Sequence, residues 1–210
     1  MDFVLDPVEV RVLGSLIEKE TTTPEYYPLS LNALVNACNQ KSNRDPLVSY
    51  DDETVEDALA TLRPKGLTMT FTGAGSRVPK HGHRLAEKLN LGRRETAILC
   101  ELMLRGPQTV GELKNRAERM HRFNDLEEAE SVLEHMTELV TKLPRRPGEK
   151  EQRYAHLLSG APRVDDEAAT SEPSQSRGDR MGTLEAEVAR QREELEDLKR
   201  QFADFRRQFE

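Results

Sequence analysis

The stretch DDETVEDALATLRPKGLTMTFTGAGSRVPK, residues 51–80, changes its hydrophobic period half-way along. In its first part the apolar residues fall at 55, 58, 59 and 62, which is the spacing of a helix that packs one face on a core. Asp51 or Asp52 caps the start of this helix, and Pro64 ends it. The first part therefore predicts a helix with one buried face.

The second part of the same stretch predicts a β-hairpin. Apolar residues alternate with threonine over 67–71, the Gly-Ala-Gly sequence at 73–75 reverses the chain, and residues 77–79 return. Two further helices are predicted upstream, one opening with the capping sequence Asp-Pro-Val-Glu at 6–9 and one capped by Ser30. Three helices followed by a two-stranded hairpin is the order of elements in a winged-helix domain.

The same order recurs in the second half of the chain. Glu95 and the apolar residues after it repeat the pattern that begins at Glu9, and the capping box Thr-Val-Gly-Glu at 109–112 opens the next helix. A third helix starts near Asp125, and a second hairpin follows over 140–155. Two copies at this long period indicate a tandem duplication of one domain rather than a solenoid.

These patterns predict a mainly α protein with small β-hairpins, built from tandem winged-helix domains plus a C-terminal coiled-coil helix. Between them lies a segment rich in Ala, Pro, Ser and charged residues, with almost no large apolar side chains, so we expect a disordered linker there. The expected boundaries are winged-helix domain 1 at 1–90, winged-helix domain 2 at 91–160, the linker at 161–182 and the coiled coil at 183–210.

The C-terminal segment places an apolar residue, or Gln191, at alternating spacings of four and three, which is a heptad seam. In a parallel pair Glu187 faces Arg192 of the second copy and Glu194 faces Lys199, so the charges favour a parallel homodimer. A lone amphipathic helix that packs on the domains is the alternative, and the choice between two and three strands stays open. The expected dimerisation residues are Leu184, Val188, Leu195, Leu198, Phe202, Phe205 and Phe209.

The charge balance is acidic. The 210 residues carry a formal net charge of −7 at pH 7, which argues against a protein that coats nucleic acid through overall positive charge. The excess of acid lies in residues 1–90 and 161–210, while 91–160 carry twelve Lys/Arg and twelve Asp/Glu. No membrane span is expected, and the N-terminus lacks the basic and apolar regions of a secretory signal, so we expect a cytoplasmic protein.

No catalytic motif stands out in the sequence, which has no phosphate-binding loop with Lys-Ser/Thr, no His-Glu-x-x-His and no Cys-x-x-Cys. His81 and His83 flank Gly82, but no third ligand stands at a suitable spacing, so neither a metal nor a cofactor is expected. Cys38 and Cys100 lie alone in apolar helical patterns and are expected to be reduced core thiols. We therefore expect a binding protein and not an enzyme.

Four runs of sequence resemble the YceH-like proteins, a family of bacterial proteins with tandem winged-helix domains. They are residues 12–19 (VLGSLIEK), 26–32 (YYPLSLN), 38–44 (CNQKSNR) and 153–158 (RYAHLL). The resemblance covers most of 5–160, leaves out the linker and tail, and implies the same tandem fold. It implies no activity, because the family has no established reaction or catalytic residues.

Winged-helix domains usually bind DNA by placing the third helix in the major groove. Here the outward faces of both third helices are predicted to be acidic, with Glu53, Glu56 and Asp57 on the first. The second has no Lys or Arg and carries Glu127, Glu128, Glu130, Glu134 and Glu138. Because such a face repels phosphate, docking of the second helix in a groove is not expected.

Two hypotheses about the partner follow. In one, the dimer binds duplex DNA mainly through phosphate contacts from the two hairpins, or wings, and from a basic helix that carries Lys114 to Arg122. In the other, the domains bind a protein partner and contact no nucleic acid. The candidate nucleic-acid-binding residues are Arg77, Lys80, Arg84, Lys114, Arg116, Arg119, Arg122, Arg145, Arg146, Lys150 and Arg153.

Overall fold

Seven α-helices and two small antiparallel sheets make up the part of the chain that the computed structural model describes, which is residues 3–72, 78–145 and 148–162. These residues belong to one unit, Met1–Arg163. The predicted coiled coil at 183–210 lies outside the described residues, as does most of the predicted linker. The same holds for the predicted dimerisation residues Leu184, Val188, Leu195, Leu198, Phe202, Phe205 and Phe209.

The described elements confirm a mainly helical chain with small antiparallel sheets. The first half contains α1 (Pro7–Thr22), the short 3₁₀ helix η1 (Pro24–Tyr26), β1 (Leu29–Ser30), α2 (Leu31–Cys38), α3 (Asp52–Leu62), β2 (Thr68–Phe71) and β3 (Lys80–His83). The short helix α4 (Leu85–Leu89) connects it to the second half. That half contains α5 (Arg93–Arg105), α6 (Val110–Ala117), α7 (Leu126–His135), β4 (Val140–Lys142) and β5 (Tyr154–His156).

Local capping explains where the helices begin. The Asp6 carboxylate accepts from the backbone N–H groups of Val8 and Glu9 at 2.8 Å, and the backbone N–H of Asp6 donates to the Glu9 carboxylate at 2.9 Å. Thr109 and Glu112 form the same reciprocal box at the start of α6. The predicted helix starts are thus confirmed, with single caps at Ser30, Asp51 and Asp125.

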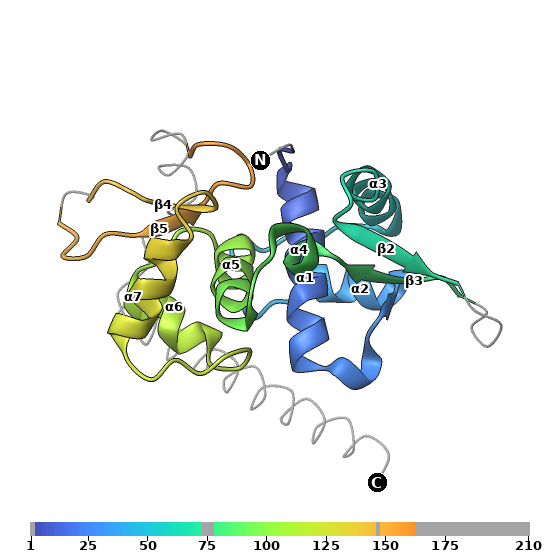
Figure 1. The fold of residues 1–210 in the computed structure, drawn as a ribbon. Coiled ribbons are helices and arrows are strands. Elements are labelled where there is room, and N and C mark those ends of the chain that lie inside the picture. Colours follow the sequence, from blue (N-terminus) through green and yellow to red (C-terminus); the bar gives the residue numbers. More distant parts are fainter. Residues whose placement is uncertain (1–2, 73–77, 146–147, 163–210) are drawn as a thin grey trace, which may run out of the picture. The chain divides into compact units, whose positions relative to one another are not determined.

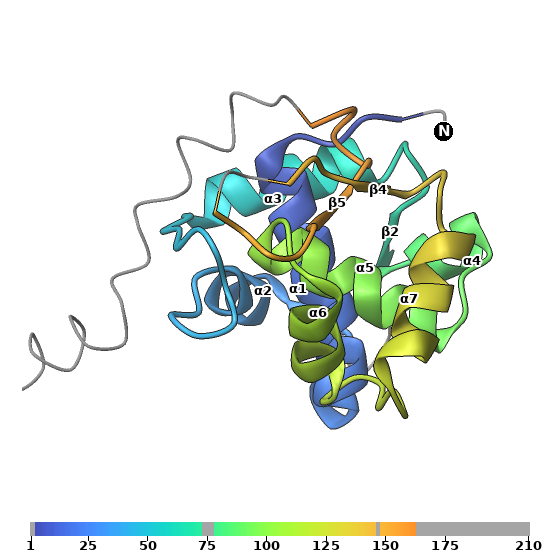
Figure 2. The same ribbon diagram turned by 90° about the vertical axis from the view of Figure 1, so that its left-hand side faces the viewer.

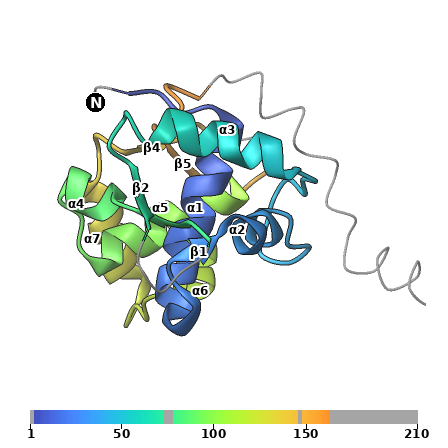
Figure 3. The same cartoon turned by 90° about the vertical axis from the view of Figure 1, so that its right-hand side faces the viewer.

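Each half ends in a small antiparallel sheet. In the first sheet β3 lies between β1 and β2, and Figure 3 shows β1 beside α2. In the second sheet β4 pairs with β5, and an isolated bridge between Gln108 and Tyr154 occupies the place that β1 has in the first half. The two halves therefore share one order of elements along the chain.

The returning strand of the first hairpin begins at Lys80, beyond the predicted 77–79. Its sequence Lys-His-Gly-His has no apolar alternation, and its place is set by pairing with β1 on one side and β2 on the other. Gly82 lets two rings lie close to this strand, since a Cβ there would lie 2.9 Å from Cε2 of Phe71 and 3.0 Å from the hydroxyl of Tyr27 and would displace them. Non-local pairing of this kind leaves no periodic signal in the sequence.

Helices α1 and α5 lie side by side, with α2, α3, β2 and β3 to one side of them and α6, α7, β4 and β5 to the other (Figures 1 and 2). The Cys100 thiol of α5 donates to the carbonyl oxygen of Gly14 in α1 at 3.3 Å. Gly14 permits this approach, because a Cβ there would lie 3.0 Å from Cδ2 of Leu104. Buried residues of both halves form one hydrophobic cluster, so the core is continuous across the predicted boundary between 90 and 91.

The beginning and the end of the described unit also meet. The backbone N–H of Leu5 donates to the carbonyl oxygen of Leu158 at 2.8 Å, and both side chains are buried. Among the described helices, none combines the length and the apolar character that crossing a membrane requires.

Candidate functional site

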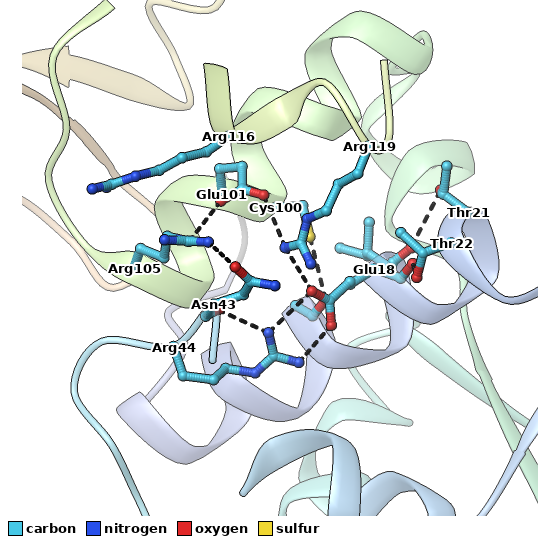
Figure 4. Close-up of polar contacts among 12 residues, drawn as sticks. Glu18, Thr21, Thr22, Asn43, Arg44, Cys100, Glu101, Arg105, Arg116 and Arg119 are labelled. Atoms are coloured by element: carbon cyan, nitrogen blue, oxygen red, sulfur yellow. Dashed lines mark hydrogen bonds and ion pairs between the residues drawn. The ribbon is translucent and has the colours of Figure 1, made fainter. Parts of the chain in front are cut away.

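A buried network of charged side chains joins α1, α5 and the loop between α2 and α3 (Figure 4). Glu18 of α1 and Arg44 of this loop both have 0% of their side-chain surface exposed. The Arg44 guanidinium donates to both carboxylate oxygens of Glu18, at 3.1 and 2.5 Å, and also to the carbonyl oxygen of Ala37 at the end of α2. This bidentate geometry is the strongest form of the arginine–carboxylate pair, and it holds the loop against α1.

Helix α6 ends at Ala117, so the prediction of one helix from Lys114 to Arg122 is wrong, and Arg119 and Arg122 lie beyond it. Arg119 reaches the same network from the second half. Its Nη2 lies 2.6 Å from Oε1 of Glu18 and 3.0 Å from Oε1 of Glu101, a fully buried side chain of α5. The other oxygen of Glu101 lies 3.0 Å from Nε of Arg105, and Arg105 donates to the side chain of Asn43 in the loop. We call Glu18, Asn43, Arg44, Glu101, Arg105 and Arg119 the Glu18 network.

The loop that supplies Asn43 and Arg44, residues 39–51, is fixed at further points. Asn39 and Tyr50 exchange two hydrogen bonds, of 2.7 and 2.8 Å. The backbone N–H of Asp45 donates to the carbonyl oxygen of Leu104 in α5 at 2.9 Å. The loop therefore bridges the two halves.

The surroundings shift the pKa values of the two buried carboxyl groups in opposite directions. Burial alone raises the pKa of Glu18, but the hydrogen bonds and charge of Arg44 and the charge of Arg119 outweigh it and hold that pKa below the ordinary value. At Glu101 burial dominates and raises the pKa, the charges of Arg119 and Arg105 offset only part of the rise, and Glu18 adds to it. Glu18 is thus the better stabilised anion of the two.

The two cysteines are buried and free, as predicted. Burial raises the pKa of Cys38 to about 11 and raises the pKa of Cys100 well above its ordinary value. Both thiols are therefore held in the neutral form, in which a cysteine is a weak nucleophile.

Five of the predicted nucleic-acid-binding residues pair with carboxylates of the chain itself. Arg119 belongs to the Glu18 network. Such pairing reduces the positive charge that these residues offer to a phosphate. The other pairs are Arg84 with Glu87 at 2.9 Å, Arg116 with Glu112 at 3.3 Å, Arg122 with Glu118 at 3.7 Å, and Arg153 with Glu112 and Glu149 at 3.5 and 3.4 Å.

The remaining predicted cations are spread over the chain. Within residues 3–72, 78–145 and 148–162 no carboxylate pairs with Lys80 of β3, Lys114 of α6, or Arg145 and Lys150 of the β4–β5 connection. Arg77 and Arg146 lie outside the described residues. The four cations without a carboxylate partner thus come from three separate elements.

The third helix of each half exposes carboxylates to solvent, as predicted. Its buried face is apolar and includes Leu59 on α3 and Leu133 on α7. The exposed acidic residues are Asp52, Glu53, Glu56 and Asp57 on α3, and Glu127, Glu130 and Glu134 on α7. Two residues predicted for the same face differ: Glu138 lies beyond the end of α7 at His135, and Glu128 is half-buried and pairs with Arg94 at 3.5 Å.

A second polar cluster surrounds His83 at the end of β3. The His83 side chain is only 3% exposed, and its Nε2 lies 2.7 Å from the carboxylate of Glu20. The backbone N–H of His83 donates to the hydroxyl of Tyr27 at 2.7 Å, and the hydrogen bond with His83 lowers the pKa of Glu20. His81 lies in the same strand, opposite Leu29, and the described residues contain no group of three His, Cys, Asp or Glu that could hold a metal.

The sequence patterns did not single out Glu18, Arg44, Glu101 or Arg105. The sequence does contain one sign of a buried ion pair: Glu101 is the charged residue within the apolar run Ala-Ile-Leu-Cys-Glu-Leu-Met-Leu at 97–104. A charge inside a buried helical face needs a partner. The partner cannot be identified from spacing, since Arg119 lies 18 residues from Glu101 and Arg44 lies 26 from Glu18.

The family to which the chain is similar is described as "Protein of unknown function, DUF480", and its profile matches residues 5–149. The chain belongs to this family. The matched part of the DUF480 protein contains all six residues of the Glu18 network, and the family resemblance seen in the sequence is confirmed.

Several bacterial relatives named "UPF0502 protein" match this DUF480 chain over most or all of their length. The protein from Solibacter usitatus (strain Ellin6076) is 58% identical over 214 residues and covers 100% of both chains. The protein from Citrifermentans bemidjiense is 56% identical over 195 residues, or 90% of each chain. The protein from Pelobacter propionicus is 52% identical over 220 residues and covers 100% of both chains.

Proposed function

We propose that this DUF480 protein is a non-enzymatic, dimeric adaptor that binds another protein, and that each half is a winged-helix domain used as an interaction module. Support for the winged-helix assignment comes from the order helix, strand, helix, helix, strand, strand over α1 to β3. The second half follows the same order, with the bridge at Gln108 in place of the first strand.

The observation that carries the adaptor proposal is the exposed carboxylates of α3 and α7. In a winged-helix domain that reads DNA, this helix enters the major groove between two phosphate backbones. Carboxylates in that position add repulsion and release no counterions. The same faces complement a protein surface rich in Lys and Arg, which we propose as the partner's chemistry.

Duplex DNA binding through phosphate contacts is the second candidate function. It is favoured by Lys80, Lys114, Arg145 and Lys150, which have no carboxylate partner among the described residues. Those charges would contact DNA from the wings and from α6 and would give little sequence selectivity. The carboxylates paired with Arg84, Arg116, Arg119 and Arg153 weaken this candidate relative to the adaptor.

Dimerisation is proposed from the heptad seam of residues 183–210 alone. A parallel pair of tails would bring two copies of the described unit together and double the number of binding modules. Two modules that act on one partner bind more tightly than either does alone, provided that the linkers let both engage.

Charge reversal on α7 tests the adaptor proposal. Full-length wild type, Glu130→Lys/Glu134→Lys and a control with the same change of charge elsewhere, Glu25→Lys/Glu151→Lys, are recovered from bacterial cells, and co-purifying proteins are quantified. All four glutamates are exposed, so the variants are expected to fold. The proposal predicts partners that the α7 variant loses and the control keeps. Recovery of the same proteins with both variants would contradict it.

A further inference from the structure

A hollow of about 480 Å³ lies beside the Glu18 network. Three arginines from separate parts of the second half line it, namely Arg105 of α5, Arg116 of α6 and Arg119 from the turn after α6. Their side chains are 18%, 35% and 29% exposed, so they are partly removed from water but still reachable by a ligand. The full lining is Asn43, Arg105, Asn115, Arg116, Glu118 and Arg119.

The charges around this hollow do not balance. In the Glu18 network three arginines face the two carboxylates of Glu18 and Glu101, and Lys19 also lies 3.7 Å from Glu18. Arg116 pairs with Glu112 outside the network, and Arg153 shares that carboxylate. The pKa of Arg105 is lowered. Burial is the largest cause; the charge of Glu101 raises this pKa, and repulsion from Arg116 and other arginines lowers it further. Glu118 at the rim is well exposed and pairs with Arg122. The cations of the Glu18 network and its surroundings therefore outnumber the carboxylates that pair with them.

The same arginines have hydrogen-bond donors to spare. Within the described part of the chain, Arg119 makes its hydrogen bond and ion pairs through Nη2, and its Nε and Nη1 donate to no residue there. Nη1 of Arg105 and Nε of Arg116 likewise donate to no described residue. Each of these free N–H groups belongs to a charged guanidinium and can donate a charge-assisted hydrogen bond to a phosphate oxygen.

We propose that this hollow binds a small phosphate-bearing anion, held by Arg105, Arg116 and Arg119 with Asn43 and Asn115 at its edge. The anion supplies the missing counter-charge and accepts the free N–H donors. Because Arg105 and Asn43 connect the hollow to the loop at 39–51, the bound anion also strengthens the junction between the two halves. The site is independent of the acidic faces of α3 and α7.

Calorimetric titration of the full-length protein with inorganic pyrophosphate tests this site, at about 50 mM salt and with sodium chloride of matched ionic strength as the blank. We expect saturable binding in the wild type. Arg116→Gln should weaken it about tenfold or more, because one charge-assisted donor group is lost. The matched control is Arg122→Gln, whose side chain is 85% exposed and does not line the hollow, and it should bind as the wild type does.

Asn115→Asp provides a second variant, which keeps every arginine and adds a negative charge at the hollow. It should also abolish or strongly weaken pyrophosphate binding. A titration with adenosine diphosphate separates the two sources of the phosphate group: tighter binding than pyrophosphate assigns a nucleotide, and equal binding assigns the bare diphosphate. Absence of saturable binding in the wild type would overturn the proposal. So would equal affinities of Arg116→Gln and Arg122→Gln for pyrophosphate.

Discussion

At Glu18 and Arg44, two opposite charges lie fully inside the protein. Removing charges from water costs several kcal/mol per ion, and their attraction repays this only when the geometry is good and the other polar atoms are satisfied. Here Arg44 also satisfies the carbonyl of Ala37, and Glu18 also contacts Arg119. The pair therefore fixes how the loop and the two halves meet, more than it adds net stability.

Loss of one partner should be costly. We expect Arg44→Met to lower the free energy of unfolding by about 3–5 kcal/mol, since it leaves the Glu18 carboxylate buried without its main donor. The exposed Arg122→Met should stay within about 0.5 kcal/mol of wild type. In the double variant Glu18→Gln/Arg44→Met the loss should be smaller than the sum of the single losses. Urea unfolding measures these three variants together with Glu18→Gln and the wild type. Equal effects of Arg44→Met and Arg122→Met would argue against a buried pair.

Acid should weaken the network through Glu18. Its folded-state pKa is lowered, so its contribution to stability is complete above the ordinary carboxyl pKa of about 4.3 and is lost as the pH falls through the folded value. The raised pKa of Glu101 has the opposite sign, and its contribution is lost as the pH rises through the folded value. We expect the urea midpoint to fall less steeply below about pH 5 in Glu18→Gln than in wild type. Parallel profiles would contradict this.

Among the elements, the pairing of α1 with α5 sets the arrangement of the halves. The repeat that aligns Glu9 with Glu95 also aligns Gly14 with Cys100, and these two residues contact each other. The side chain of Leu104 lies over Gly14. The repeat aligns Leu104 with Glu18. Burial raises the pKa of Cys100, and the charge of Glu18 raises it further. The contact between Gly14 and Cys100 thus joins equivalent positions of the two halves, as contacts near the axis of an isologous interface do.

A side chain at Gly14 should push these two helices apart. We expect Gly14→Val to lower the free energy of unfolding by about 1–3 kcal/mol, because Cδ2 of Leu104 occupies the space for the new Cβ. Gly111 of α6 is the matched control, since its nearest neighbour would lie 4.0 Å from a Cβ. Gly111→Ala should raise stability by up to about 1 kcal/mol through helix propensity. Thermal unfolding measures the stability of both variants. A Gly14→Val variant as stable as the wild type would contradict close packing of α1 on α5.

Most helices were predictable because their start signals are local. Asp6 with Glu9, and Thr109 with Glu112, reveal a helix start within four residues of sequence. By contrast, β1 and the true position of β3 depend on partners far along the chain, and α4 is too short to carry a period. Acidic third-helix faces follow directly from helical spacing. The Glu18 network does not, because its members meet only through tertiary packing.

For the whole molecule, the heptad seam predicts a dimer held by the tail. Light scattering after size-exclusion chromatography of the full-length protein should give twice the chain mass at micromolar concentration. Leu195→Asp/Phe202→Asp places two charges in the seam and should give the mass of a single chain. A wild-type chain that is monomeric at this concentration would remove the dimer from the proposal.

The choice between a protein partner and DNA is tested most directly by titrating fluorescent duplex DNA against the full-length protein at about 50 mM and about 200 mM salt. If the acidic third helices define the function, wild type shows no saturable binding, whereas Glu127→Lys/Glu130→Lys/Glu134→Lys gains binding that weakens with salt. The contradicting result would be saturable, salt-sensitive DNA binding by the wild type that Arg145→Glu/Lys150→Glu abolishes. That result would contradict the adaptor proposal and assign DNA binding to the wings.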